Sequence, residues 1–188
     1  MSTKVIQLSR LLSLIAFATA AFLPLWRIEI WAPQYPEGLS MQIGSYWMSG
    51  DIAQINILNH YIGMKHIVPS EILELKLIPW LYAALVVFGA FAVLSRNRLT
   101  FMVWFAFVMG SVLIGMIDFY RWGYDYGHNL DPAAPIKIPG MTYQPPLIGS
   151  KILLNIHSYS LPDFGGYLFG VALLLGIIGM MPLVAKSK

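Results

Sequence analysis

Four apolar runs divide the chain, and two long polar stretches lie between them. The apolar runs cover residues 11–30, 77–94, 99–117 and 164–185, and the polar stretches cover residues 31–76 and 118–163. A membrane-spanning helix needs about 20 mostly apolar residues, which is close to the length of each run. The pattern therefore predicts an all-α integral membrane protein, with one membrane domain of four transmembrane helices and two long loops.

The first apolar run has a second interpretation, as a cleaved signal peptide. Ala18-Thr-Ala20 resembles the small-residue site at which such peptides are cut. Apolar residues continue past this site to Trp31, which favours a retained helix. Cleavage of residues 1–20 stays open as the alternative.

The first polar stretch predicts two short elements. Residues 39–46 suit a strand or another extended segment. From Asp51 to Met64 the apolar residues recur at the spacing of a helix, after a start at Gly50. Ser70 is a candidate N-cap for the helix that contains the second apolar run.

The second polar stretch predicts where the third helix ends. Asp118 stands three residues before Arg121, so the two side chains can pair on a continuing helix. Gly123 and Gly127 suit the end of that helix or a turn of its backbone.

Beyond this point the stretch is rich in proline and glycine. Residues 138–151 predict a stiff, extended segment that either covers the first polar stretch as a lid or docks a partner protein. Residues 151–157 predict a short surface helix. Ser160 is the predicted N-cap of the last helix, with Asp163 as the acid of a capping box.

The composition agrees with a membrane protein and excludes several kinds of site. Hydrophobic residues make up 57% of the 188 residues and charged residues 11%, whereas soluble domains carry about 25% charged residues. The chain has no cysteine, which excludes disulfides, thiolate metal sites, haem attached through C-x-x-C and cysteine nucleophiles.

The charges predict how the helices are oriented. Basic residues flank the apolar runs at the two ends of the chain and in the turn between the second and third runs: Lys4, Arg10, Arg96, Arg98, Lys186 and Lys188. All nine acids lie in or beside the polar stretches. By the positive-inside rule both termini are cytoplasmic, and the polar stretches lie on the opposite, extracytoplasmic side of the membrane. The net charge of +3 therefore reflects orientation, and no nucleic-acid partner is expected.

The polar stretches also contain every histidine, and this suggests a metal site. Without cysteine, histidine nitrogens and methionine sulfurs favour copper, because the thioether is a soft ligand that suits Cu(I). The candidate metal ligands are His60, Met64, His66, His128 and Met141. Candidate second-shell or docking groups are Asn56, Asn59, Asp125, Asn129, Asp131 and His157. The alternative is that each histidine forms local hydrogen bonds only.

Three segments resemble a family of small four-helix bacterial membrane proteins associated with nitrous oxide reductase maturation and copper handling. They are Asn59-His-Tyr-Ile-Gly-Met64, Tyr124-Asp-Tyr-Gly-His-Asn-Leu-Asp-Pro132 and Pro139-Gly-Met-Thr-Tyr-Gln-Pro-Pro-Leu-Ile-Gly149. The resemblance implies delivery of copper to a periplasmic copper enzyme, or support for its assembly. It carries over no catalytic residue.

No catalytic motif is present, and no charged residue lies in the middle of an apolar run, which disfavours an ion transporter. The sequence therefore predicts a non-enzymatic, membrane-anchored accessory protein whose loops bind or relay copper. The alternative is a structural subunit of a membrane oxidoreductase complex that docks a partner through the same loops. A third and weaker hypothesis is an enzyme that acts on a lipid or a small molecule at the membrane surface. The expected partners are the lipid bilayer and a periplasmic or membrane protein.

Overall fold

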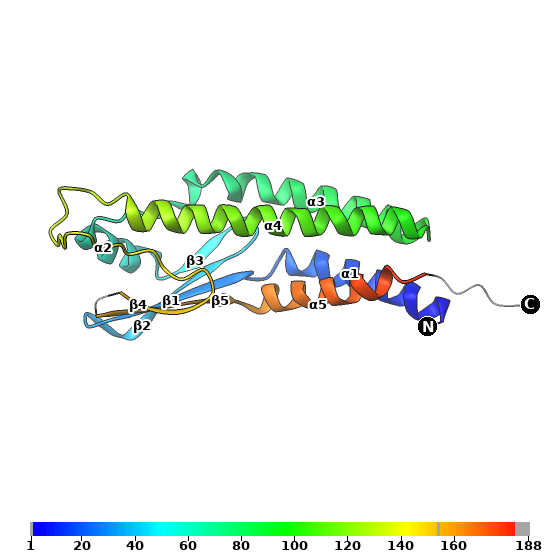
Figure 1. Ribbon diagram of the computed structural model, residues 1–188, viewed down its shortest axis with the longest axis horizontal. Helices are drawn as coiled ribbons and strands as arrows, with labels where there is room; N and C mark the ends of the chain where they lie inside the picture. The colour runs from blue at the N-terminus through cyan, green and yellow to red at the C-terminus, as the bar shows by residue number, and fades with distance from the viewer. Residues whose placement is uncertain (1, 154, 183–188) are drawn as a thin grey trace, which may run out of the picture.

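The prediction of an all-α fold is wrong, because the chain also forms an antiparallel sheet. The structure is a computed structural model that describes residues 2–153 and 155–182. Over these residues it has five α-helices, a short 3-10 helix and one five-stranded sheet, which makes the fold mixed α/β (Figure 1). Helices α1 and α5 extend from one end of the sheet, and α3 and α4 run alongside them, with α4 continuing beside the sheet (Figure 1).

The elements have the following bounds. The helices are α1 (Thr3–Ala20), α2 (Ile52–Ile62), α3 (Leu73–Leu94), α4 (Arg98–His128) and α5 (Phe164–Gly179), with the 3-10 helix at Pro69–Glu71. The strands are β1 (Trp26–Ala32), β2 (Tyr35–Ile43), β3 (Met48–Gly50), β4 (Gly149–Leu153) and β5 (Ile156–Pro162). They lie in the order β3-β2-β1-β5-β4, and every pairing is antiparallel.

The central strand β1 begins inside the first apolar run, where a helix was predicted, and ends two residues beyond it. Helix α1 ends at Ala20, and Pro24 lies in the short link before β1. Beyond it the side chains alternate with the period of a strand, since Ile28 is buried while Arg27 is exposed. Ile28 is paired with Met41 of β2 and with Ser160 of β5. Both partners lie outside the first apolar run, so a count of apolar residues within that run could not reveal the strand.

Two further predictions in the second polar stretch are also wrong. The predicted surface helix at residues 151–157 is instead part of the β4–β5 hairpin, in which Ile152 pairs with His157. Ser160 belongs to β5, and the N-cap of α5 is Asp163, whose Oδ1 accepts a 2.7 Å hydrogen bond from the Phe164 backbone N–H. The capping chemistry was identified, but it was assigned three residues too early.

The helix boundaries correct two other predictions. Helix α4 continues through Gly123 and Gly127 to His128 instead of ending at these glycines. Ser70 lies in the 3-10 helix, and the N-cap position of α3 is Ile72, which makes no side-chain capping bond. The predicted extended segment at residues 39–46 and the helix from Asp51 are confirmed as β2 and α2.

Three helices, α1, α3 and α4, are long and apolar enough to cross a membrane by length and composition. Helix α5 is apolar but has only 16 residues, and the predicted fourth span, residues 164–185, extends outside the described residues. At about 1.5 Å per residue, a helix of 31 residues such as α4 is about 46 Å long and exceeds an apolar bilayer core of about 30 Å. The end of α4 therefore continues beyond its apolar part and lies beside the sheet (Figure 1).

A buried arginine joins the helices at the end of the bundle far from the sheet, where α1 begins and α5 ends (Figure 1). Arg10 of α1 has no exposed surface, and its Nε donates a 2.7 Å hydrogen bond to the carbonyl of Gly179 at the end of α5. Its Nη1 donates to the carbonyl of Arg96 in the α3–α4 turn at 3.2 Å, and the guanidinium lies over the ring of Phe101. Carbonyls at helix ends lack partners within the helix, so one side chain satisfies two of them.

The first testable prediction concerns this contact. Replacing Arg10 by lysine keeps the charge but loses the fork that reaches both carbonyls, so we expect a loss of stability of about 1–3 kcal/mol. The measurement is thermal unfolding of the purified protein in detergent. Lys4→Arg, at an exposed position of the same helix, is the matched control and should unfold as the wild type does. Equal melting temperatures for Arg10→Lys and the control would show that the two carbonyl contacts add no stability.

Candidate functional site

The candidate site lies in the part of the molecule that contains the sheet. We call this part the sheet region: the five strands, α2, residues 129–148 and the end of α4 from Asp118. One face of the sheet packs on α2 and α4 through a cluster that includes Ile28, Met41, Ile55 and Leu58. Period-two alternation in the strands supplies one wall of this cluster, and the apolar face of α2 supplies another. The two polar stretches of the sequence therefore form one packed unit.

The loop at residues 129–148 holds α2 and α4 together, as expected for a lid. The backbone N–H of Asp131 donates to the carbonyl of Gly63 at 2.8 Å, at the end of α2. The N–H of Ile136 donates to Tyr61, and that of Tyr143 donates to the carbonyl of Gly127 in α4, both at 2.9 Å. The two bonds to α2 come from residues before the predicted segment, whereas Tyr143 and Met141 of the segment itself pack against Ile62 and Met64 of the first polar stretch.

The segment after α2 is held by side chains that were predicted as second-shell groups. Asn56 donates to the carbonyl of Ile67 at 2.9 Å and accepts from its N–H at 2.7 Å. Asn59 is buried and donates to the carbonyl of Lys65 at 3.2 Å. These two amides fix the path of residues 65–67, which include His66.

Helix α4 contacts the same segment through its last turns. The ammonium of Lys65 lies 2.6 Å from Oδ2 of Asp125, and Tyr126 donates through its hydroxyl to the carbonyl of His66 at 3.2 Å. The hydrogen bond from Lys65, and then one from the amide of Asn129, hold the pKa of Asp125 below its usual value. The carboxylate therefore stays ionised and keeps α4 attached to the segment that carries His66.

Two of the predicted metal ligands lie side by side. His60 is in the last turn of α2, and Gly63 then reverses the chain with a positive φ of 80°, which glycine adopts without strain. This reversal brings His66 back to His60, with ring centroids 6.2 Å apart. Both side chains are exposed, so the pair is accessible from outside.

The other predicted ligands have different surroundings. His128 stacks on Tyr124, with ring centroids 3.8 Å apart, and its Nδ1 is 3.0 Å from the Tyr124 carbonyl oxygen. Met64 and Met141 pack in an apolar cluster around Tyr143. Among the residues that the structure describes, no three His, Asp or Glu side chains form a group that can hold a metal ion.

The remaining second-shell candidates have structural contacts. Asp131 accepts from the N–H of Ala133 at 2.7 Å and so closes a turn, and Asn129 bonds Asp125. His157 is exposed on β5 and lies opposite Trp31 of β1, away from the face that packs on α2.

Sequence reasoning missed an apolar pocket between the sheet, α2 and α4. It has a volume of about 60 Å³, and most of its lining is apolar. Tyr143 from the lid loop and Ser158 from β5 also line it, and each is only 2% exposed. Neither hydroxyl has a hydrogen-bond partner in the described part of the chain. One sequence signal could have indicated the pocket, namely the alternation along β5 that buries Ser158 and Ser160. This alternation can be recognised only when the segment is known to be a strand.

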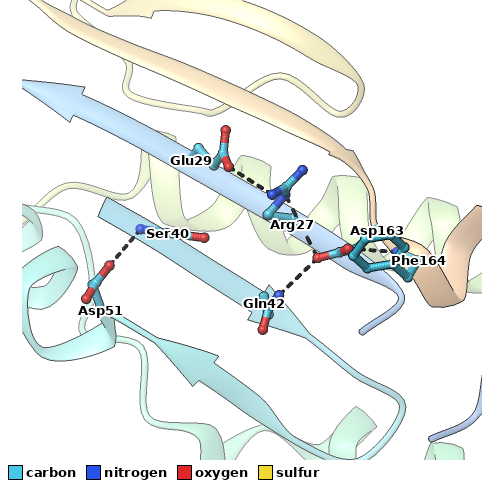
Figure 2. A network of polar contacts seen from close by, with 7 residues as sticks. All are labelled: Arg27, Glu29, Ser40, Gln42, Asp51, Asp163 and Phe164. Atoms are coloured by element: carbon cyan, nitrogen blue, oxygen red, sulfur yellow. Dashed lines mark hydrogen bonds and ion pairs between the residues drawn. The ribbon is translucent and has the colours of Figure 1, made fainter. Parts of the chain in front are cut away.

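No helix in the described part of the chain covers the opposite face of the sheet, and this face carries a polar network (Figure 2). Arg27 pairs with Glu29 at 3.2 Å and lies 3.9 Å from the buried carboxylate of Asp163. Gln42 donates to the same carboxylate at 3.1 Å. The network joins β1 and β2 to the start of α5.

Fold and site together define a mixed α/β protein with three helices able to cross a membrane and a sheet region attached to them. Comparison with known proteins adds no relative: no protein-family model, curated protein or solved structure matches the chain. The resemblance to proteins of nitrous oxide reductase maturation therefore stays a prediction.

The second testable prediction concerns the lid loop. In Gly127→Ala the added methyl group would overlap the backbone of Gln144, so we expect the loop to separate from α4. Limited proteolysis should then cut residues 129–148 at least several-fold faster than in the wild type.

Gly123→Ala is the matched control, one turn earlier on the same helix, where an added Cβ meets no atom within 4 Å. It should leave proteolysis unchanged and stabilise α4 by about 0.5–1 kcal/mol, because alanine favours a helix interior over glycine. Equal proteolysis of the two variants would refute the proposed tight contact between loop and helix.

Proposed function

We propose that the protein is a membrane-anchored accessory protein whose sheet region binds Cu(I) between His60 and His66. On this proposal it relays the ion to a periplasmic copper enzyme or assists the assembly of that enzyme. The observation that carries the proposal is the adjacency of the two exposed imidazole rings, which come from the end of α2 and from the segment that follows it.

The distance between the rings supports a site for one metal ion. A metal–nitrogen bond is about 2 Å long and a ring nitrogen lies about 1 Å from its centroid, so two imidazoles on one metal have centroids at most about 6 Å apart. The observed separation of 6.2 Å is at this limit, which corresponds to the two nitrogens on opposite sides of the metal. Because both side chains are exposed, a small change of rotamer shortens the separation without disturbing the core.

The ligand chemistry favours Cu(I) over harder metals. Two neutral imidazoles suit copper, and Cu(I) accepts two ligands in a line, whereas Zn²⁺ sites almost always have four ligands. An exposed site with few ligands suits transfer of the ion better than storage. Thioether ligands would strengthen it, and Met64 follows His60 by four residues, but its side chain packs toward Tyr143.

The charge distribution supports a periplasmic position for the site. Arg10, Arg96 and Arg98 lie at the end of the bundle far from the sheet region, and their contacts join α1, α5 and the α3–α4 turn there. By the positive-inside rule that end faces the cytoplasm of a bacterial inner membrane, and the sheet region faces the periplasm. Lys186 and Lys188, which also entered the prediction, lie outside the described residues.

A second candidate function is that of a structural subunit which docks a partner through the uncovered sheet face. The observation that favours it is the pair of Trp31 and Tyr159, whose rings meet edge to face at 5.2 Å on that face, beside the edge strand β4. Such aromatic groups are frequent at protein interfaces. Substitution of Tyr159 by arginine should then release a co-purifying subunit in size-exclusion chromatography, without changing copper binding.

The third testable prediction is the loss of Cu(I) binding when either histidine of the pair is removed. Purified protein in detergent is titrated with Cu(I) under reducing conditions, in competition with a chromogenic Cu(I) chelator. We expect one ion per chain for the wild type and an affinity lower by tenfold or more for His60→Ala and for His66→Ala, because each removes one of two ligands.

His157→Ala is the matched control, since this histidine is also exposed but lies on the other face of the sheet. It should bind copper as the wild type does. A double variant of His60 and His66 that keeps the wild-type stoichiometry and affinity would disprove the copper site.

A further inference from the structure

The pocket of the sheet region combines apolar walls with two buried hydroxyl groups that have no protein partner. Tyr143 and Ser158 contribute these hydroxyls from two different elements, the lid loop and β5. Buried polar groups in folded proteins are nearly always hydrogen-bonded, because leaving one unpaired is costly. Two such groups in one pocket therefore point to a bound molecule that supplies a polar atom.

The lining determines the charge of that molecule. No charged side chain lines the pocket, so an ion would lose its hydration there without gaining a counter-ion. A hydroxyl or carbonyl oxygen suits the site, since it accepts a hydrogen bond from Tyr143 or Ser158. The remainder of the molecule must be apolar, because Ile28, Ile55 and Ile156 form much of the wall.

The size of the pocket and its neighbourhood determine the shape of the molecule. A volume of about 60 Å³ holds a polar group and a few carbons, but not a whole lipid. A smaller hollow shares Trp122, Gly123 and Pro145 with the pocket and extends to Phe119 and Tyr120. These two residues are closer to the apolar part of α4, so a chain that leaves the pocket along this hollow reaches the membrane surface.

We propose that the pocket binds the oxygen-bearing end of a neutral single-chain amphiphile, such as a long-chain alcohol or ester, taken from the membrane. Tyr143 and Ser158 bond its oxygen, and its chain follows the hollow beside Trp122 toward the bilayer. This site is distinct from the proposed copper site, because His60 and His66 do not line the pocket.

Gly123 provides a variant that tests the proposal without disturbing the fold. It is buried and lines both hollows, yet an added Cβ would meet no atom within 4 Å. A leucine at this position would extend into the empty space and occupy it. Gly123→Leu should therefore fold and block the pocket, while Gly123→Ala leaves most of it open.

The experiment uses the full chain in lipid nanodiscs and a bromoalkanol with its bromine beside the hydroxyl group. Bromine quenches tryptophan fluorescence on contact, and Trp122 lines the pocket. We expect saturable quenching in the wild type and in Gly123→Ala, and only the unsaturable background from the membrane in Gly123→Leu and in Trp122→Phe. The bromoalkanoate of equal length, which is charged, should bind at least tenfold more weakly than the alcohol.

The hydroxyls are tested separately by the double variant Tyr143→Phe and Ser158→Ala, which keeps the shape of the pocket. Its affinity for the bromoalkanol should fall tenfold or more, while its weaker affinity for a bromoalkane without the hydroxyl stays that of the wild type. Identical saturable quenching in the wild type and Gly123→Leu, or equal affinity for alcohol and carboxylate, would overturn the proposal. Absence of saturable quenching in the wild type would overturn it as well.

Discussion

One buried carboxylate, that of Asp163, joins the helical bundle to the sheet region. It is 3% exposed and accepts the backbone N–H of Phe164, which begins α5. The same side chain accepts from Gln42 of β2 and faces Arg27 of β1 (Figure 2). A helix N-terminus favours a negative charge, and a buried charge needs partners, so the three contacts are mutually dependent. Without the carboxylate, α5 and the sheet would be joined only by their chain connection, by backbone hydrogen bonds to the link before β1 and by apolar contacts.

The backbone of the link before β1 also lies very close to the backbone at the start of α5, and this contact is a second connection between the bundle and the sheet region. The N–H of Gly165 donates to the carbonyl of Pro24 at 2.8 Å, and a Cβ at Gly166 would overlap the carbonyl of Leu25. Glycine is required at position 166 because a larger residue would collide with the link and push α5 away from it. The direction in which the sheet leaves the bundle is therefore set by a few atoms. That direction determines where α4, continuing past its apolar part, meets the sheet and closes the pocket.

The sequence predicted the elements whose signals are local. Apolar length indicated helices over most of α1, α3 and α4, and helical spacing indicated α2, because each signal lies within one segment. The sheet was missed because β1 follows α1 after a short link, and its alternation of isoleucine with Arg27 and Glu29 was counted as part of an apolar run. Its pairing with β5 joins residues more than a hundred positions apart, for which one sequence gives no signal.

The same reasoning explains what was predicted of the candidate site. Asn56, Asn59 and Asp125 were selected as groups that support histidines, and in the structure they hold the segment around His66. The adjacency of His60 and His66 followed from their short separation, whereas the surroundings of His128 and Met141 depended on how a long loop folds. The pocket depends on Ser158 of β5 and Gly123 of α4 facing each other across the core, so it required the tertiary structure.

Asn59 links the two proposed sites physically. Its side chain lines the pocket, and its amide donates to the carbonyl of Lys65, next to His66. The wall of the pocket is therefore also the support of the histidine pair. A segment that is already fixed loses little conformational entropy when an ion binds to it. This favours a metal site with only two coordinating residues, both of which have exposed side chains. In the proposed copper site, the polar contacts around residues 65–67 would thus offset the small number of metal ligands, because they hold the segment that carries one histidine beside the other histidine.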